Sequence, residues 1–221
     1  MERITLVYGE TGSGKSTAAK ALLRERAHIF AIDPMGEYGG ADWSVCETRR
    51  GVLNAVTDRI RKGKRLKISY RCGGAYATEA PWLARAIYCF QMANKGTVGV
   101  SPHVTLVMEE ANAYYPAQAI QSGPAQIFDE LVLRGRHYGV NILAVTQRPS
   151  LISTTLRGNA GEIWAFHMPM DRDRKAVDEK AEGASAKIKT LPDFHCLRVR
   201  RRSLETWRTL KSGGLKPVNK K

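Results

Sequence analysis

The sequence predicts an α/β protein built on a mostly parallel sheet with helices on both faces. Short apolar segments alternate along the chain with segments rich in helix-forming residues. Such alternation is typical of parallel strands joined by right-handed helical crossovers. The first apolar segment also leads into a glycine-rich loop and then a helix-forming stretch. That order is the one in which a phosphate-binding loop follows a strand.

The predicted strands are short runs of aliphatic and β-branched residues. They cover residues 3–8, 28–33, 65–71, 104–108, 139–146 and 163–167. The run 65–71 alternates polar and apolar residues, which predicts a half-exposed strand. The predicted helices cover residues 16–26, 50–61, 79–94, 124–137 and 172–184. Residues 111–123 read as an irregular, functional loop, and 196–199 lead into a basic C-terminal stretch.

The chain of 221 residues is long enough for one domain, at residues 1–197, with a basic extension at 198–221. The extension contributes +8 of the formal net charge of +14. Such an excess suggests a polyanionic partner, most often nucleic acid, although a basic tail can also serve solubility alone. No apolar run approaches the roughly 20 residues of a membrane span, so we expect a soluble protein without a transmembrane segment.

The first loop matches the phosphate-loop pattern GxxxxGK[ST] and would hold a nucleoside triphosphate. Its glycines let backbone N–H groups surround a phosphate, and the helix that follows adds the positive end of its dipole. Lys15 would place an ammonium near the β- and γ-phosphates, and the Ser16 hydroxyl would bind Mg²⁺. The predicted ATP-binding residues are Gly9, Glu10, Thr11, Gly12, Ser13, Gly14, Lys15, Ser16 and Thr17.

Two carboxylates end the apolar segment 104–108 and predict metal binding and hydrolysis. Glu109 stands where P-loop enzymes place the acid that holds Mg²⁺, usually an Asp. Glu110 is then placed to orient and deprotonate the attacking water. Both could instead be solvated loop acids. A second acid favours water over a small-molecule acceptor, and therefore an NTPase over a P-loop kinase.

The segment 139–146 ends in a glutamine that could contact the γ-phosphate or the attacking water. Gln147 is therefore the candidate sensor residue, although it could also be an ordinary turn residue. Upstream, Arg134 and Arg136 are candidates for an arginine that stabilises transition-state charge at a neighbouring subunit. Their alternative is an interaction with the helix dipole. Arg148 and Arg157 are weaker candidates for the same role.

These motifs together resemble the FtsK–HerA superfamily of ring-forming DNA translocases. The resemblance rests on the phosphate loop, on DPMGEY at residues 33–38, on Glu109-Glu110, and on GRHYG and TQRPS at residues 135–139 and 146–150. It implies a RecA-like P-loop NTPase core of the additional-strand, catalytic-glutamate type. It also implies ATP hydrolysis at subunit interfaces of a homo-oligomeric ring, usually hexameric. Two departures are Glu109 in place of Asp, and Asn112 where a His is common.

Because the chain is short and shows no accessory domain, it looks most like the genome-packaging ATPases of membrane-containing icosahedral double-stranded DNA viruses. This implies double-stranded DNA as substrate and a capsid vertex or membrane-associated viral protein as partner. It also implies a location in the host cytoplasm or with the virion. The alternatives are a HerA-like cellular or conjugative translocase, a small-molecule kinase, and a non-catalytic nucleic-acid-binding module.

The candidate DNA contacts are basic residues that would bind phosphates without reading bases. They are Arg61, Lys62, Lys64, Arg65, Lys67 and the basic residues from Arg198 onward, including Arg200, Arg201 and Arg202.

Overall fold

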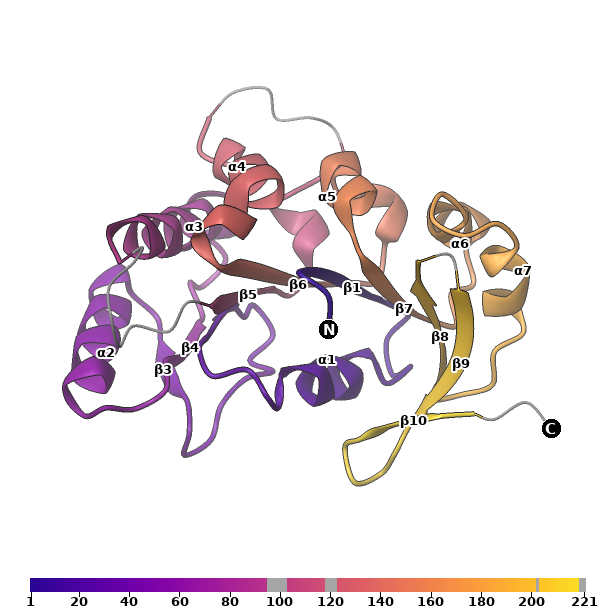
Figure 1. The fold of residues 1–221 in the computed structure, drawn as a ribbon, viewed down its shortest axis with the longest axis horizontal. Coiled ribbons are helices and arrows are strands. Elements are labelled where there is room, and N and C mark those ends of the chain that lie inside the picture. Colours follow the sequence, from indigo (N-terminus) through magenta and orange to yellow (C-terminus); the bar gives the residue numbers. More distant parts are fainter. Residues whose placement is uncertain (95–102, 118–122, 202, 219–221) are drawn as a thin grey trace.

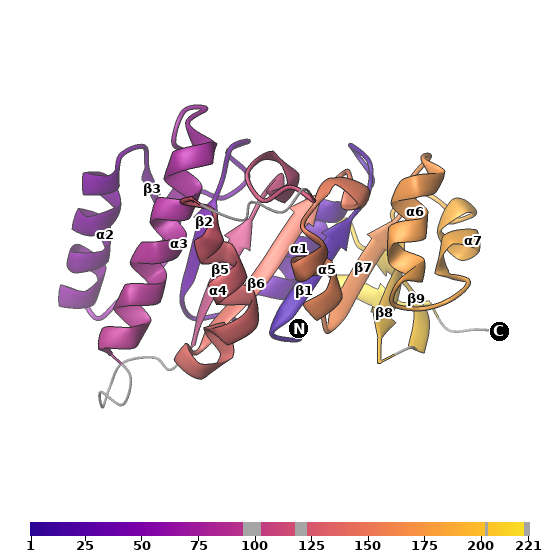
Figure 2. The same ribbon diagram turned by 90° about the horizontal axis from the view of Figure 1, so that it is seen from above.

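A ten-stranded sheet runs through the protein in the computed structural model, which describes residues 1–94, 103–117, 123–201 and 203–218. Figures 1 and 2 show helices on both faces of this sheet. The strand order is β10-β9-β8-β7-β1-β6-β5-β2-β4-β3. The strands from β7 to β3 pair in parallel, and β8, β9 and β10 continue the sheet in antiparallel pairs. The predicted fold class is therefore confirmed.

The strands are short, as expected for buried parallel strands. They are β1 (Ile4–Tyr8), β2 (Ile29–Ile32), β3 (Ser44–Cys46), β4 (Lys67–Tyr70), β5 (Val104–Met108), β6 (Val140–Thr146), β7 (Glu162–Phe166), β8 (His195–Arg200), β9 (Ser203–Thr209) and β10 (Leu215–Pro217).

The helices are α1 (Lys15–Leu23), α2 (Arg49–Arg61), α3 (Tyr76–Ala93), α4 (Gln126–Arg134), α5 (Thr154–Asn159), α6 (Asp171–Asp178) and α7 (Ala184–Lys189). Helices α1 to α5 lie in the connections between the parallel strands, and α6 and α7 connect β7 to the antiparallel β8. Short 3₁₀ turns lie at η1 (Ala111–Ala113), η2 (Gly135–Tyr138) and η3 (Pro149–Leu151). No helix among the described residues is long and apolar enough to cross a membrane.

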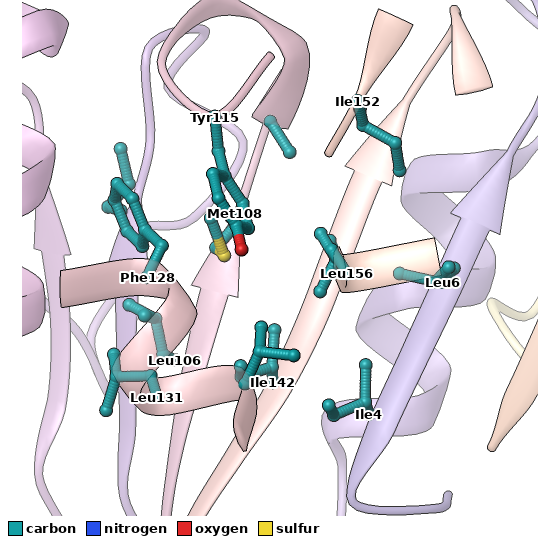
Figure 3. Close-up of a cluster of buried hydrophobic side chains, with 14 of the residues drawn as sticks. Ile4, Leu6, Leu106, Met108, Tyr115, Phe128, Leu131, Ile142, Ile152 and Leu156 are labelled. Atoms are coloured by element: carbon teal, nitrogen blue, oxygen red, sulfur yellow. The ribbon is translucent and has the colours of Figure 1, made fainter. Parts of the chain in front are cut away.

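The core lies in two layers, one on each face of the sheet. On one face, Leu6, Leu106 and Ile142 from the strands pack with side chains of α4 and α5, as Figure 3 shows. On the other face, Val7 and its neighbours pack against α1. Because successive side chains of a strand point to opposite faces, every residue of β1 is buried. This double burial fixes the central strands, and so the loops that follow them.

The structure corrects two predictions about individual elements. The strand at 65–71 is not half-exposed, because β4 lies between β2 and β3 and its residues 68–70 are buried. The helix predicted at 172–184 is two helices, α6 and α7, and Gly183 precedes α7 with a left-handed backbone at φ 80°. The strands β3, β8, β9 and β10 were not predicted.

The predicted boundary at residues 197 and 198 falls inside β8, and β9 and β10 extend the same sheet. Two arginines of the basic extension form internal ion pairs here. Arg198 contacts buried Glu162 at 2.7 Å and Glu205 at 3.4 Å, and Arg200 contacts Glu2 at 2.6 Å. Arg202 and residues 219–221 lie outside the described part of the chain, as do residues 118–122 of the predicted loop.

Candidate nucleotide-binding site

The predicted site residues other than Arg134 and Arg136 meet at the carboxyl ends of three neighbouring parallel strands. β1 pairs with β6 so that Tyr8 faces Thr146, and β5 pairs with β6 so that Met108 faces Ala144. The loops that follow these strands carry the phosphate loop, the acid pair and Gln147. Parallel pairing thus brings together three segments that are far apart in the sequence, at the edge where ligands of open α/β sheets bind.

Glycine is required at two ends of the phosphate loop. A Cβ at Gly9 would lie 2.5 Å from the Ser13 hydroxyl oxygen and 2.7 Å from the Phe166 Cβ. Gly14 precedes α1 with a left-handed backbone at φ 101°. The ammonium of Lys15, a buried residue, lies 3.4 Å from the Glu10 carbonyl oxygen at the start of the loop. The start of the loop therefore contacts the lysine at its end, and the loop curves around the space where a phosphate would bind.

A chain of hydrogen bonds joins this loop to the second acid of the pair. The Thr11 hydroxyl donates to Gln147 Oε1 at 2.9 Å, and Gln147 Nε2 donates to Glu110 Oε1 at 3.0 Å. Glu110 has a left-handed backbone at φ 47°, which places it at the turn into η1. Gln147 thus touches both the phosphate loop and the predicted catalytic carboxylate. Its role as the γ-phosphate sensor remains a prediction.

Glu109 is buried and held by a tyrosine of the DPMGEY segment. The Tyr38 hydroxyl donates to Glu109 Oε1 at 2.8 Å. Burial raises the pKa of Glu109 to about 7, and the neighbouring carboxylates Glu37, Asp33 and Glu110 also raise it, whereas the Tyr38 bond lowers it. This carboxylate is therefore surrounded by negative charge that a cation would relieve.

Asp33 explains why the DPMGEY segment holds this shape. Its carboxylate accepts the backbone N–H groups of Glu37 at 2.7 Å and Tyr38 at 3.0 Å, and the Ser69 hydroxyl at 2.7 Å. The fully buried Asp33 therefore closes the turn that follows β2 and aims Tyr38 at Glu109. Sequence reasoning found this motif only as a family likeness and missed the role of Tyr38.

The donor set fits a magnesium ion that is shared with phosphates. Hydroxyl and carboxylate oxygens, as in Ser16 and Glu109, are the ligands that Mg²⁺ prefers. The described residues contain no cluster of three or more His, Cys, Asp or Glu side chains that could hold a metal ion alone. Mg²⁺ usually keeps waters and substrate phosphates among its ligands, so a sparse protein shell is expected.

The loop after Gln147 is fixed by a residue that sequence reasoning missed. Asp173 of α6 accepts from Arg148 Nε at 3.0 Å, and from the Ser150 amide at 3.0 Å and hydroxyl at 2.6 Å. Arg157 contacts the Pro149 carbonyl oxygen at 3.0 Å and Glu179 at 3.2 Å. Arg148 and Arg157 thus have internal partners that hold this loop. No local signal in the sequence connects Asp173 to a loop more than twenty residues upstream.

Asn112, where the FtsK–HerA pattern of the sequence analysis leads one to expect a His, contacts the end of β6. Its side-chain oxygen accepts from the Thr146 hydroxyl at 2.7 Å. Thr146 is the last residue of β6 and directly precedes Gln147. The substitution therefore leaves a polar link between the turn after β5 and the strand that carries the sensor.

A second unforeseen contact lies on the other side of the phosphate loop. His167 follows β7, and its Nδ1 lies 2.7 Å from Glu10 Oε1. The Glu10 backbone N–H also donates to the His167 carbonyl oxygen at 3.3 Å. These contacts tie the beginning of the loop to β7, while Thr11 ties it to Gln147 beyond β6.

Arg134 and Arg136 lie far from this edge within the same chain. Arg134 ends α4 and Arg136 lies in η2. Because η2 directly precedes β6, both arginines lie at the amino ends of the parallel strands. Arg134 pairs with Glu130 at 3.3 Å, and Arg136 is exposed. They could reach a triphosphate only in another copy of the chain. The basic residues between α2 and β4 also lie at the amino ends of the parallel strands.

Comparison with known proteins gives matches to P-loop ATPases. Residues 1–72 match the family model described as the central domain of helicase HerA. The fold is similar to that of the genome-packaging NTPase B204 from Sulfolobus turreted icosahedral virus 2, solved in complex with AMPPCP. The TM-score between the two structures is 0.68. The identity is 18%, and the match covers 92% of this chain and 95% of that one. No curated protein sequence matches the chain.

Two further proteins share the fold at lower similarity. The pCW3 conjugation coupling protein TcpA, solved with ATPγS, has a TM-score of 0.62 at 14% identity, covering 94% of this chain and 60% of that one. VirB4 of Thermoanaerobacter pseudethanolicus has a TM-score of 0.58 at 12% identity, covering 91% and 87%. The predicted likeness to the FtsK–HerA superfamily of P-loop ATPases is thereby confirmed, in the HerA-type N-terminal third and in the fold of the whole chain.

Proposed function

We propose that this chain hydrolyses ATP to move double-stranded DNA, as the packaging motor of a viral genome. The observation that carries the ATPase proposal is the continuous contact from Thr11 through Gln147 to Glu110. An amide that touches both the phosphate loop and a carboxylate on the next loop can link the presence of a γ-phosphate to the activation of water. A kinase has no need of this second acid.

In this mechanism the loop N–H groups and Lys15 bind the β- and γ-phosphates. Glu110 accepts a proton from the attacking water, and Gln147 orients that water against the γ-phosphate. Bound Mg²⁺, held by Ser16 and Glu109, would neutralise phosphate charge. Arg136, or Arg134, of a neighbouring copy would stabilise the charge that develops in the transition state.

The ring and the DNA substrate are supported by two features. The candidate arginines lie opposite the phosphate loop in the sheet, so each site needs a second copy to be complete. The likeness to the packaging NTPase B204 also extends over nearly the full length of both chains. We propose a homo-oligomeric ring of six copies that works in the host cytoplasm or with the virion and docks on a capsid vertex or a membrane-associated viral protein.

A second candidate is a HerA-like cellular or conjugative translocase. It is favoured by the HerA family match and by the shared fold of TcpA and VirB4. Its chemistry at the nucleotide would be the same, and its partners would differ. Capsid genes next to the coding gene favour packaging, whereas a nuclease or relaxase gene favours this alternative.

The ATPase proposal is tested by Glu110→Gln, which keeps the side-chain shape but removes the base. We expect ATP to bind at near wild-type affinity while hydrolysis falls by roughly 100-fold or more. Phosphate release is measured with and without duplex DNA, and wild-type release should rise with DNA. The matched control is Glu47→Gln at an exposed glutamate outside the site. Wild-type rates in Glu110→Gln would refute the catalytic assignment, and indifference of wild-type rings to duplex DNA would refute the motor.

A further inference from the structure

A small pocket lies beside the phosphate loop, on the side away from Gln147. Its volume is about 170 Å³, and it is lined by loop residues, by His167 and by the segment between α7 and β8. The lining residues from this part of the chain are Pro192, Asp193 and Phe194, which precede β8, and His195, its first residue. The nucleotide assignment above uses none of these four residues.

Phe194 has an unusual backbone conformation in this segment. Among the described residues, three that are not glycine have a left-handed backbone: Glu110, Phe194 and Arg201. Glu110 belongs to the proposed catalytic site, and Arg201 lies in the tight turn between β8 and β9. Phe194, at φ 60°, is the third residue of the β-turn Pro192–His195, where a left-handed backbone usually calls for glycine or asparagine. For a bulky side chain such a conformation is a genuine outlier, and strain of this kind often marks a functional position.

The conformation is held from both sides, yet it does not bury the ring. The Phe194 carbonyl oxygen accepts from the Thr209 amide at 2.9 Å and from the Thr209 hydroxyl at 3.3 Å. The His195 amide donates to the Pro192 carbonyl oxygen at 3.1 Å. The side chain nevertheless remains 55% exposed. The protein therefore maintains a strained backbone that leaves an aromatic face open to solvent.

The ring stands next to the start of α1. A Cβ built on Gly14 would lie 3.5 Å from Phe194 Cδ1 and 3.0 Å from the Thr209 hydroxyl oxygen. The antiparallel course of β8 explains this closeness. β8 pairs with β7 so that Cys196 faces Phe166, which brings the beginning of β8 to the edge where β7 and β1 end.

The order of the strands gives a direction to a bound triphosphate. Gln147 and Glu110 define the γ-phosphate end, and they follow β6 and β5 on one side of β1. Phe194 and His167 lie beyond β7, on the other side of β1. A triphosphate with its γ end at Gln147 would therefore leave its nucleoside toward the Phe194 pocket.

We infer that Phe194 is the stacking platform for the nucleobase of the bound triphosphate, in the pocket between the phosphate loop and residues 192–195. The inference rests on the proposed nucleotide function of the loop. Stacking on an exposed aromatic face needs no specific pattern of hydrogen bonds, so the platform accepts any base and favours the larger purines. It contributes affinity for the base and none for the phosphates.

The test compares Mg·ATP with Mg·tripolyphosphate, which lacks a base, by isothermal titration calorimetry. The first variant is Phe194→Gly, since glycine adopts the left-handed backbone without strain and should not impair folding. We expect its affinity for ATP to fall by about tenfold while its affinity for tripolyphosphate stays unchanged. Phe194→Trp should restore ATP affinity, because an indole presents a stacking face as well. Leu133→Ala is the control at an exposed apolar residue of α4.

The outcomes separate this inference from the function on which it rests. If Phe194→Gly binds ATP as tightly as wild type while both ligands bind, the platform is wrong and the phosphate loop stands. If Phe194→Gly weakens both ligands equally, the residue shapes the loop and does not stack the base, and the inference is also wrong. If wild-type protein binds neither ligand, the nucleotide function itself fails, and the base platform fails with it.

Discussion

Tyr38 and Glu109 show how one hydroxyl can control the chemistry of a buried carboxylate. The Tyr38 bond lowers the pKa of Glu109 against the effect of burial, which raises it to about 7. Glu109 is only 4% exposed, so its oxygen has little access to water once this donor is removed. The hydroxyl therefore holds in position an acid that would otherwise favour its neutral form. A longer acid in place of the usual Asp makes such support more important.

We expect Tyr38→Phe to lower the free energy of unfolding by about 1–3 kcal/mol, since a buried acceptor loses its donor. The measurement is urea denaturation of the nucleotide-free protein. Tyr8→Phe is the matched control, because the buried Tyr8 hydroxyl has no hydrogen-bond partner in the described structure. Its removal should be nearly neutral. Equal losses in the two variants would show that the Tyr38 bond contributes nothing beyond packing.

At the scale of elements, the central strands could be predicted from the sequence and the outer strands of the sheet could not. The strands that end in the site are continuous apolar runs, because parallel strands are buried on both faces. β9 has no such pattern, since its residues alternate between exposed and half-buried positions. β3 has three residues, too few for a periodic signal. β3 is defined by its pairing with β4, which lies beyond a helix in the sequence, and β9 by its hairpins with β8 and β10.

The site divides in the same way. The phosphate loop, the acid pair and Gln147 carry motifs whose residue types follow from phosphate chemistry. Asp173 and Phe194 carry none, because their positions depend on how α6 and β8 return to the sheet edge. Local sequence contains the groups that react, whereas long-range packing places the groups that support them.

The phosphate loop itself allows a prediction from one of its glycines. We expect Gly9→Ala to abolish most nucleotide binding, because the new methyl group would collide with Ser13 and with the Phe166 Cβ. Gly63→Ala, between α2 and β4, is the matched control: no atom lies within 4 Å of the new Cβ, although the backbone has φ 61°. That control should cost only the left-handed strain of about 1 kcal/mol. Calorimetric titration with Mg·ATP measures both, and equal affinities in the two variants would contradict the steric explanation.

At the scale of the whole molecule, the proposed site divides between the two ends of the parallel strands. The phosphate loop, Glu110 and Gln147 lie at the carboxyl ends of the parallel strands. Arg134 and Arg136 lie at the amino ends of these strands, with the basic residues that follow α2. A head-to-tail contact between two copies would bring the carboxyl ends of the strands in one copy to the amino ends of the strands in the other. Repetition of such a contact closes a ring when the rotation between copies allows it.

This arrangement predicts complementation between two inactive variants. Arg136→Ala and Glu110→Gln should each be inactive alone, for opposite reasons: one lacks the arginine that it gives to its neighbour, and the other lacks its own base. In a mixed assembly, an Arg136→Ala copy keeps Glu110 and can receive Arg136 from a Glu110→Gln neighbour. Random mixing in equal amounts places this pair at up to roughly a quarter of the contacts, and ATPase activity should return in that proportion.

Arg134→Ala, mixed in the same way, shows whether the second arginine takes part. Full activity of Arg136→Ala alone would exclude this residue as the shared group, and an inactive mixture that still assembles would show that both groups act within one copy.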